Sequence, residues 1–195
     1  MKIIKFNILF IVIILFISGC FGKTQKMMNQ NDNDKIKAKT IAVMPVENKS
    51  ADNKAAQLLR FRLLEELYFK GYSKLSLEMI DKKMNINPNK KNASAIAPRK
   101  LKDAVGADAG LYCTLTEDNR SKLFYAPFKI AVRCELRSTD TGEVLWNAQS
   151  ESIKRNFDFT HKGLEKKSQE DFEAVIDEVV NNIIKTLPDG PNLRG

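Results

Sequence analysis

The segment 128–137 alternates between apolar and charged side chains with a period of two. Its apolar members are Ile130, Val132, Cys134 and Leu136, and its charged members are Lys129, Arg133, Glu135 and Arg137. This period places successive side chains on opposite faces of a β-strand. The segment therefore predicts a strand with one face buried in a core and the other face in water.

Two further strands are predicted on either side of this one. The residues Asp140-Thr141-Gly142 follow it and are typical of a hairpin turn, after which Val144, Trp146 and Ala148 resume the alternation. Before it, Ala109–Glu117 places Leu111, Cys113 and Leu115 on one face. The chain therefore predicts a three-stranded antiparallel meander.

The first part of the predicted domain is a strand followed by a helix. Thr40–Val46 is almost entirely apolar and should end as a strand near Pro45, which cannot donate to a ladder. Glu47–Ser50 is predicted as a loop, and Asp52 as a helix N-cap. The helix carries its apolar stripe at positions 56, 59, 63 and 67 and should end at Gly71. Leu75 and Leu77 are predicted to begin a second strand.

The remaining helices are shorter or lie at the end of the chain. Glu78–Met84 predicts a short helix, and Pro98–Val105 predicts another that ends at Gly106. Asn156–Lys167 is interpreted as a charged connection. The apolar stripe from Phe172 to Ile184 predicts a helix that packs on the sheet. The fold class is thus α/β (α+β): a mixed sheet of about five strands with a strand-helix-strand start, the meander and a C-terminal helix.

The N-terminus has the order of a bacterial lipoprotein signal peptide. Lys2 and Lys5 precede an uncharged apolar run, residues 8–17, and Ser18-Gly19-Cys20 follows it. The run is about half of the roughly 20 residues that a membrane-spanning helix needs, so an uncleaved anchor is the weaker alternative. We expect cleavage between Gly19 and Cys20 and lipid attachment to Cys20. Phe21, where an aspartate would favour retention at the inner membrane, indicates the outer membrane.

These features divide the chain into four parts. Residues 1–19 are the predicted signal peptide, 20–39 the lipidated cysteine and a polar tether, 40–188 a single domain and 189–195 a C-terminal tail. The formal charge is +8, and loss of the signal peptide's two lysines leaves +6 (8 − 2). Because the lysines are dispersed and aromatic residues are few, a solvated face is favoured over a nucleic-acid surface.

Cys113 and Cys134 remain after Cys20 is assigned to lipid. Both lie in predicted strands, and an exported protein lies in a compartment where disulfides persist. A disulfide forms if the strands are neighbours in the right register. The alternative is two buried thiols that behave as small apolar residues, and spacing alone does not decide between them.

No catalytic, metal or cofactor site is predicted. The only histidine is His161, and a metal shell or hydrolytic triad needs more than one such group. Gly106–Gly110 precedes a strand, so it is a turn and no dinucleotide fingerprint. Glu117 and Asp118 are interpreted as solvated residues at a hairpin tip. Trp146 is interpreted as a core residue, with a stacking site as the alternative.

Several short motifs together resemble a known family. These are Thr40-Ile-Ala-Val-Met-Pro-Val-Glu-Asn-Lys-Ser50, then Leu101-x4-Gly106-Ala-Asp-Ala-x-Leu-Tyr112, then Leu136-x5-Gly142-x2-Leu-Trp146. Their order and spacing resemble a bacterial lipoprotein family of unknown function typified by a neisserial surface antigen. That family is similar to the TolB N-terminal domain and to LpoB-like lipoproteins. The resemblance implies a mixed α/β domain that binds other envelope proteins, with a homo-oligomer as one option, and it implies no catalytic residues.

The expected function is therefore that of a non-catalytic binding or assembly module. It would be anchored to the outer membrane through its N-terminal lipid, face the periplasm, and contact envelope proteins or another lipoprotein. Two alternatives stay open. One is an LpoB-like regulator of peptidoglycan synthesis, and the other is a solute- or lipid-binding component of an envelope transport system.

Overall fold

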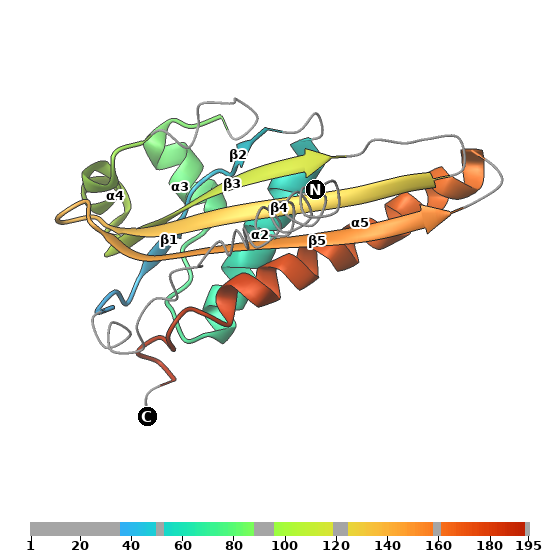
Figure 1. The fold of residues 1–195 in the computed structure, drawn as a ribbon. Helices are drawn as coiled ribbons and strands as arrows, with labels where there is room; N and C mark the ends of the chain where they lie inside the picture. Colours follow the sequence, from blue (N-terminus) through green and yellow to red (C-terminus); the bar gives the residue numbers. More distant parts are fainter. Residues whose placement is uncertain (1–35, 50–52, 88–95, 119–124, 158–160, 194–195) are drawn as a thin grey trace, which may run out of the picture. The chain divides into compact units, whose positions relative to one another are not determined.

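The computed structural model describes residues 36–49, 53–87, 96–118, 125–157 and 161–193 (Figure 1). They belong to one unit, Asn31–Gly195. The predicted signal peptide, Cys20 and Asp52 lie outside the described residues, as do residues 119–124, which follow Asp118. Among the described helices, none combines the length and the apolar character that crossing a bilayer would require.

A five-stranded mixed sheet forms the centre of this unit (Figure 1). Its strands are β1 (Ile41–Val43), β2 (Glu47–Asn48), β3 (Ala109–Asp118), β4 (Tyr125–Ser138) and β5 (Val144–Phe157). The order is β1-β3-β4-β5, with β2 also paired to β3. β1 and β2 run parallel to β3, while β3, β4 and β5 form an antiparallel meander. The predicted fold class and the predicted meander are confirmed.

Four helices within the described residues cover the two faces unequally. They are α2 (Asn53–Phe69), α3 (Leu77–Met84), α4 (Pro98–Val105) and α5 (His161–Ile184). The long helices α2 and α5 pack on one face over the larger core, which includes Leu59, Val179 and Trp146. The short helices α3 and α4 cover a smaller core on the other face, beside β1 and β3. The C-terminal helix packs on the sheet as predicted.

The strand predicted at Leu75 and Leu77 is wrong. Leu77 is the first residue of α3, whose N-cap Ser76 accepts a hydrogen bond from the backbone N–H of Met79. The fifth strand is β2, at Glu47–Asn48, where the sequence predicts a loop. Two polar residues carry no apolar pattern, so their strand conformation depends on pairing with β3. The Lys49 N–H extends this pairing by donating a hydrogen bond to Leu115 O at 2.9 Å.

Two further boundaries differ from the predictions. β5 continues to Phe157 and α5 begins at His161, so the charged connection Asn156–Lys167 is wrong. Lysine, glutamate and glutamine form helices readily, so a charged stretch before an apolar stripe can belong to the same helix. Glu117 and Asp118 are the last two residues of β3, opposite Ile130 and Lys129, and so do not form the hairpin tip.

Candidate functional site

A groove of about 430 Å³ lies on the sheet face opposite α2 and α5, beside the start of α4. Its lining comes from β2, from the segment that leads into α4, and from the adjacent strands β3 and β4. The lining residues are Glu47, Ile96, Ala97, Pro98, Tyr112, Cys113, Thr114, Arg133, Glu135 and Arg137. Polar and charged side chains that alternate with the core residues of β3 and β4 therefore form its floor.

The wall of the groove depends on a glycine and a tyrosine in β3. A Cβ at Gly110 would lie 2.6 Å from Leu101 Cδ1 and 2.9 Å from the Tyr112 ring, so only glycine lets α4 approach the sheet this closely. The Tyr112 hydroxyl donates to Ile96 O at 2.9 Å and holds the segment before α4 over the strand. The short helix is thereby fixed against the sheet.

Tyr112 is partly buried in this wall. Burial raises its pKa to about 12, while the nearby Arg137 guanidinium acts in the opposite direction. That guanidinium lies 5.8 Å from the centre of the Tyr112 ring, within the range of a cation–π contact. The phenol therefore stays protonated at neutral pH and serves as a hydrogen-bond donor.

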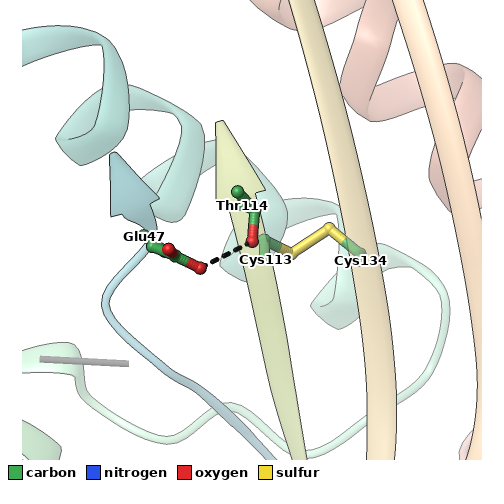
Figure 2. Close-up of a disulfide and its surroundings, with 4 residues drawn as sticks. All are labelled: Glu47, Cys113, Thr114 and Cys134. Carbon is green, nitrogen blue, oxygen red and sulfur yellow. Dashed lines mark hydrogen bonds between the residues drawn. A yellow bond between two sulfur atoms is a disulfide. The ribbon is translucent and has the colours of Figure 1, made fainter. Parts of the chain in front are cut away.

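Two carboxylates and two guanidinium groups line the groove. Arg137 Nη2 lies 2.6 Å from a carboxylate oxygen of Glu135, two residues earlier on the same face of β4. Glu47 accepts a hydrogen bond of 3.0 Å from Thr114 Oγ1, which joins β2 to β3 (Figure 2). Arg133 lies opposite Thr114 in the ladder and is exposed. The groove thus offers donors and acceptors of both charges to a polar ligand.

Cys113 and Cys134 lie opposite each other on β3 and β4. Their sulfur atoms are joined, 1.98 Å apart, and the bond crosses from one strand to the next (Figure 2). Both cysteines are buried in the larger core. The bond therefore ties together the two strands that carry most of the groove floor.

The other residues singled out in the sequence lie apart from the groove. Gly19 and Cys20 are outside the described residues, and His161 is the first residue of α5. Trp146 is buried in the core, where its ring N–H faces Thr186 O at 3.3 Å, so the core interpretation holds. Within the described ranges, no three His, Cys, Asp or Glu side chains gather to hold a metal ion.

The sequence does not predict the groove. It predicts a solvated face at the groove floor, because charged residues that alternate along a strand usually face water. The available signal was that Tyr112 and Thr114 share the outward face of a strand predicted next to Arg133 and Glu135. Locating the groove, however, required knowing that α4 packs beside them.

The fold and the groove define a class of protein: a single mixed α/β domain with one sheet face partly open. Residues 30–192 match the family described as "Putative lipoprotein GNA1162-like", so the chain belongs to that family of lipoproteins, whose description names no catalytic activity. A relative in Neisseria meningitidis serogroup B, described as "Putative lipoprotein NMB1124/NMB1162", is 25% identical over 185 residues, which cover 93% of this chain and 82% of the relative.

Solved structures show the same fold. Lipoprotein GNA1162 from Neisseria meningitidis has a TM-score of 0.55 and 21% identity over 73% of this chain and 98% of its own. A PelC dodecamer from Paraburkholderia phytofirmans has a TM-score of 0.52 and 14% identity over 78% of this chain and 88% of its own. The LpoB C-terminal domain from Salmonella enterica is a more distant match, with 18% identity over 61% of this chain and 86% of its own and a TM-score of 0.42. The likeness to the TolB N-terminal domain stays a prediction.

Proposed function

We propose that this protein is a non-catalytic assembly module of the cell envelope, anchored to the outer membrane through lipid on Cys20 and facing the periplasm. It would bind envelope proteins or another lipoprotein, including copies of itself. Membership in a lipoprotein family supports the anchor. The similar fold of PelC, whose solved structure is a dodecamer, supports self-assembly.

The observation that carries the proposal is the outer edge of β5. Within the described sheet this strand, Val144–Phe157, pairs only with β4. A strand edge of this length presents a row of backbone donors and acceptors to another chain. Addition of a strand at such an edge is a common way in which proteins associate.

The residues of β5 whose N–H groups face this edge follow from the ladder. The Cα atoms of Cys113 and Cys134 are 4.1 Å apart, the spacing of a pair that is not hydrogen-bonded to each other. The backbone polar groups of Cys134 therefore face Ala148 on β5. The next residue of β5, Gln149, turns its N–H to the free edge, and so does Glu151.

Substitution of Gln149 by proline tests the proposal. Proline removes this outward donor, is tolerated on edge strands, and leaves the β4 ladder intact. We expect the dissociation constant of the oligomer to rise at least about fivefold, which is the effect of one lost hydrogen bond. Native mass spectrometry of the acylated full chain in detergent measures it. Gln149→Thr, which keeps the N–H, is the matched control. A wild-type monomer, or equal effects of the two variants, would contradict self-assembly at this edge.

The lipid anchor has its own test. We expect the mature protein to begin at Cys20 and to carry fatty acids, because Ser18-Gly19-Cys20 after the apolar run resembles the signal for cleavage and acylation of bacterial lipoproteins. Mass spectrometry of the N-terminal peptide measures this, and Cys20→Ser is the control. An intact leader, or a mature protein without fatty acid, contradicts the anchor.

The groove favours a second candidate function, binding of a small polar solute. Its volume of about 430 Å³ is within the range of small-molecule sites, and its charged lining would orient a zwitterionic ligand. Native mass spectrometry of the protein as isolated should then retain a ligand that Arg133→Ala loses. A wild-type protein of unliganded mass would argue against this candidate.

A further inference from the structure

The chain enters the folded unit beside the C-terminal end of α2. Ile36 and Ala38 are buried in the larger core, so the path of the entering chain is held from residue 36 onward. Ser73 N–H donates to Lys39 O at 3.0 Å, and Thr40 forms a parallel bridge with Ser73. The entry point is therefore four residues beyond Phe69, the last residue of α2.

Exposed apolar side chains gather at this entry point. The described residues include six large apolar side chains that are exposed, namely Phe61, Tyr68, Phe69, Val144, Ile153 and Leu193. Three of them lie here, and Phe69 is 69% exposed. Leu193 packs over Gly71, where a Cβ would lie 2.7 Å from its Cγ, and Gly190 N–H donates to Lys70 O at 2.7 Å. The C-terminal segment is thus pinned against the end of α2.

Three lysines lie at the same end of the domain as these apolar side chains. The Lys74 ammonium lies 5.9 Å from the centre of the Tyr68 ring, and Lys37 and Lys39 are exposed on the entering chain. Among the described residues, none of these three lysines has a carboxylate partner. We define the entry patch as Tyr68, Phe69, Leu193, Lys37, Lys39 and Lys74.

We propose that the entry patch docks on the surface of the anionic bilayer that holds the lipid anchor. Aromatic rings beside lysines suit the membrane interface, where the rings enter the headgroup region and the ammonium groups pair with phosphates. The inference rests on the proposed acylation of Cys20. Residues 21–35 then join the anchor to the patch, and such a stretch reaches at most about 55 Å even when fully extended. The anchor therefore keeps the exposed apolar end of the domain within this distance of the membrane.

Quenching of a tryptophan by brominated lipid tests this orientation. The acylated full chain carrying Phe69→Trp is reconstituted into vesicles of phosphatidylethanolamine, phosphatidylglycerol and brominated phosphatidylcholine. The control is Ile153→Trp, which places the same indole at an exposed apolar residue of β5. The native Trp146 is buried and contributes the same background to both proteins. We expect quenching at position 69 and none above background at position 153.

The charge contribution is tested in the same assay. Lys74→Glu in the Phe69→Trp background should lower the ratio of docked to undocked protein at least about fivefold, the effect of one lysine near an anionic surface. Equal quenching at the two positions, with the acyl mass present on Cys20, overturns the docking of the patch while leaving the anchor intact. Absence of the acyl mass overturns both proposals.

Discussion

The two faces of the sheet differ in what covers them and in the chemistry of their side chains. One face carries Ile130, Val132 and Leu136, which α2 and α5 bury in the larger core. The other face of the same strand carries Arg133, Glu135 and Arg137, which line the groove. Each buried aliphatic side chain contributes about 1.5–3 kcal/mol to folding, whereas exposed ion pairs contribute little. Stability therefore depends mainly on the covered face, and the open face is free to serve binding.

The largest expected effect is on the covered face. Val179→Asp places a carboxylate at a fully buried position of α5, which should lower the free energy of unfolding by about 4 kcal/mol. Urea denaturation followed by circular dichroism measures the change. Asn181→Asp, at an exposed position of the same helix, should stay within about 0.5 kcal/mol of the wild type. Similar losses in both variants would contradict the unequal roles of the two faces.

The disulfide ties together the strands that carry both faces. It closes a loop with a sequence separation of 21 residues, so removing it through the double substitution Cys113→Ala and Cys134→Ala should cost about 3 kcal/mol of stability. Urea denaturation with and without reductant measures the loss. Reductant should destabilise the wild type and leave the double variant unchanged. If reductant leaves the free energy of unfolding of the wild type unchanged, the two thiols are free in the mature protein.

A partly buried ion pair joins helices on the two faces past the edge strand β1. Arg60, on α2, donates 2.8 Å hydrogen bonds to both carboxylate oxygens of Asp81, on α3, and also donates to Val43 O. Asp81→Asn leaves the buried guanidinium without its counter-charge and should cost about 2 kcal/mol. Glu78→Gln, at an exposed position of α3, is the control for thermal unfolding. Equal melting temperatures for the two variants would mean that the pair does not couple the faces.

The smallest expected effect concerns the open face. Tyr112→Phe removes the hydrogen bond to Ile96 O and should cost about 1 kcal/mol, because α4 keeps its packing on Gly110. Urea denaturation at neutral pH provides this measurement. A loss of unfolding free energy as large as that of Val179→Asp would contradict the conclusion that stability depends mainly on the covered face.

The same tyrosine makes stability depend on pH. Burial raises its pKa in the folded state from the ordinary value of 10.0 to about 12, so folding favours the protonated phenol. The stability that this contributes is complete below pH 10 and is lost as the pH rises towards 12. Tyrosinate absorbance should show a titration step near pH 12 whose amplitude Tyr112→Phe lowers by one tyrosine. An unchanged amplitude in the variant would contradict the raised pKa of Tyr112.

Strands and helices whose apolar pattern lies within one continuous segment were predicted correctly. The alternation of 128–137 and the stripe of Leu59, Leu63 and Leu67 indicate a strand and a helix without knowledge of any neighbour. The strand predicted at Leu75 and Leu77 was wrong because two apolar residues fit a strand and the start of a helix equally well. Glu47–Asn48 failed for a related reason: its strand conformation comes from the β3 backbone beside it.

The sequence by itself determined the long strands and helices and which of their faces are apolar, because a period of two or 3.6 residues is a property of the local chain. It also indicated the lipid anchor, through the order of basic, apolar and small residues before Cys20. Only the tertiary structure decided that Cys113 lies opposite Cys134 and that Tyr112, Arg133 and Glu47 share one groove. It likewise brought the aromatic end of α2 to the entering chain. Register and helix packing join residues distant in sequence, and no local pattern records such distances.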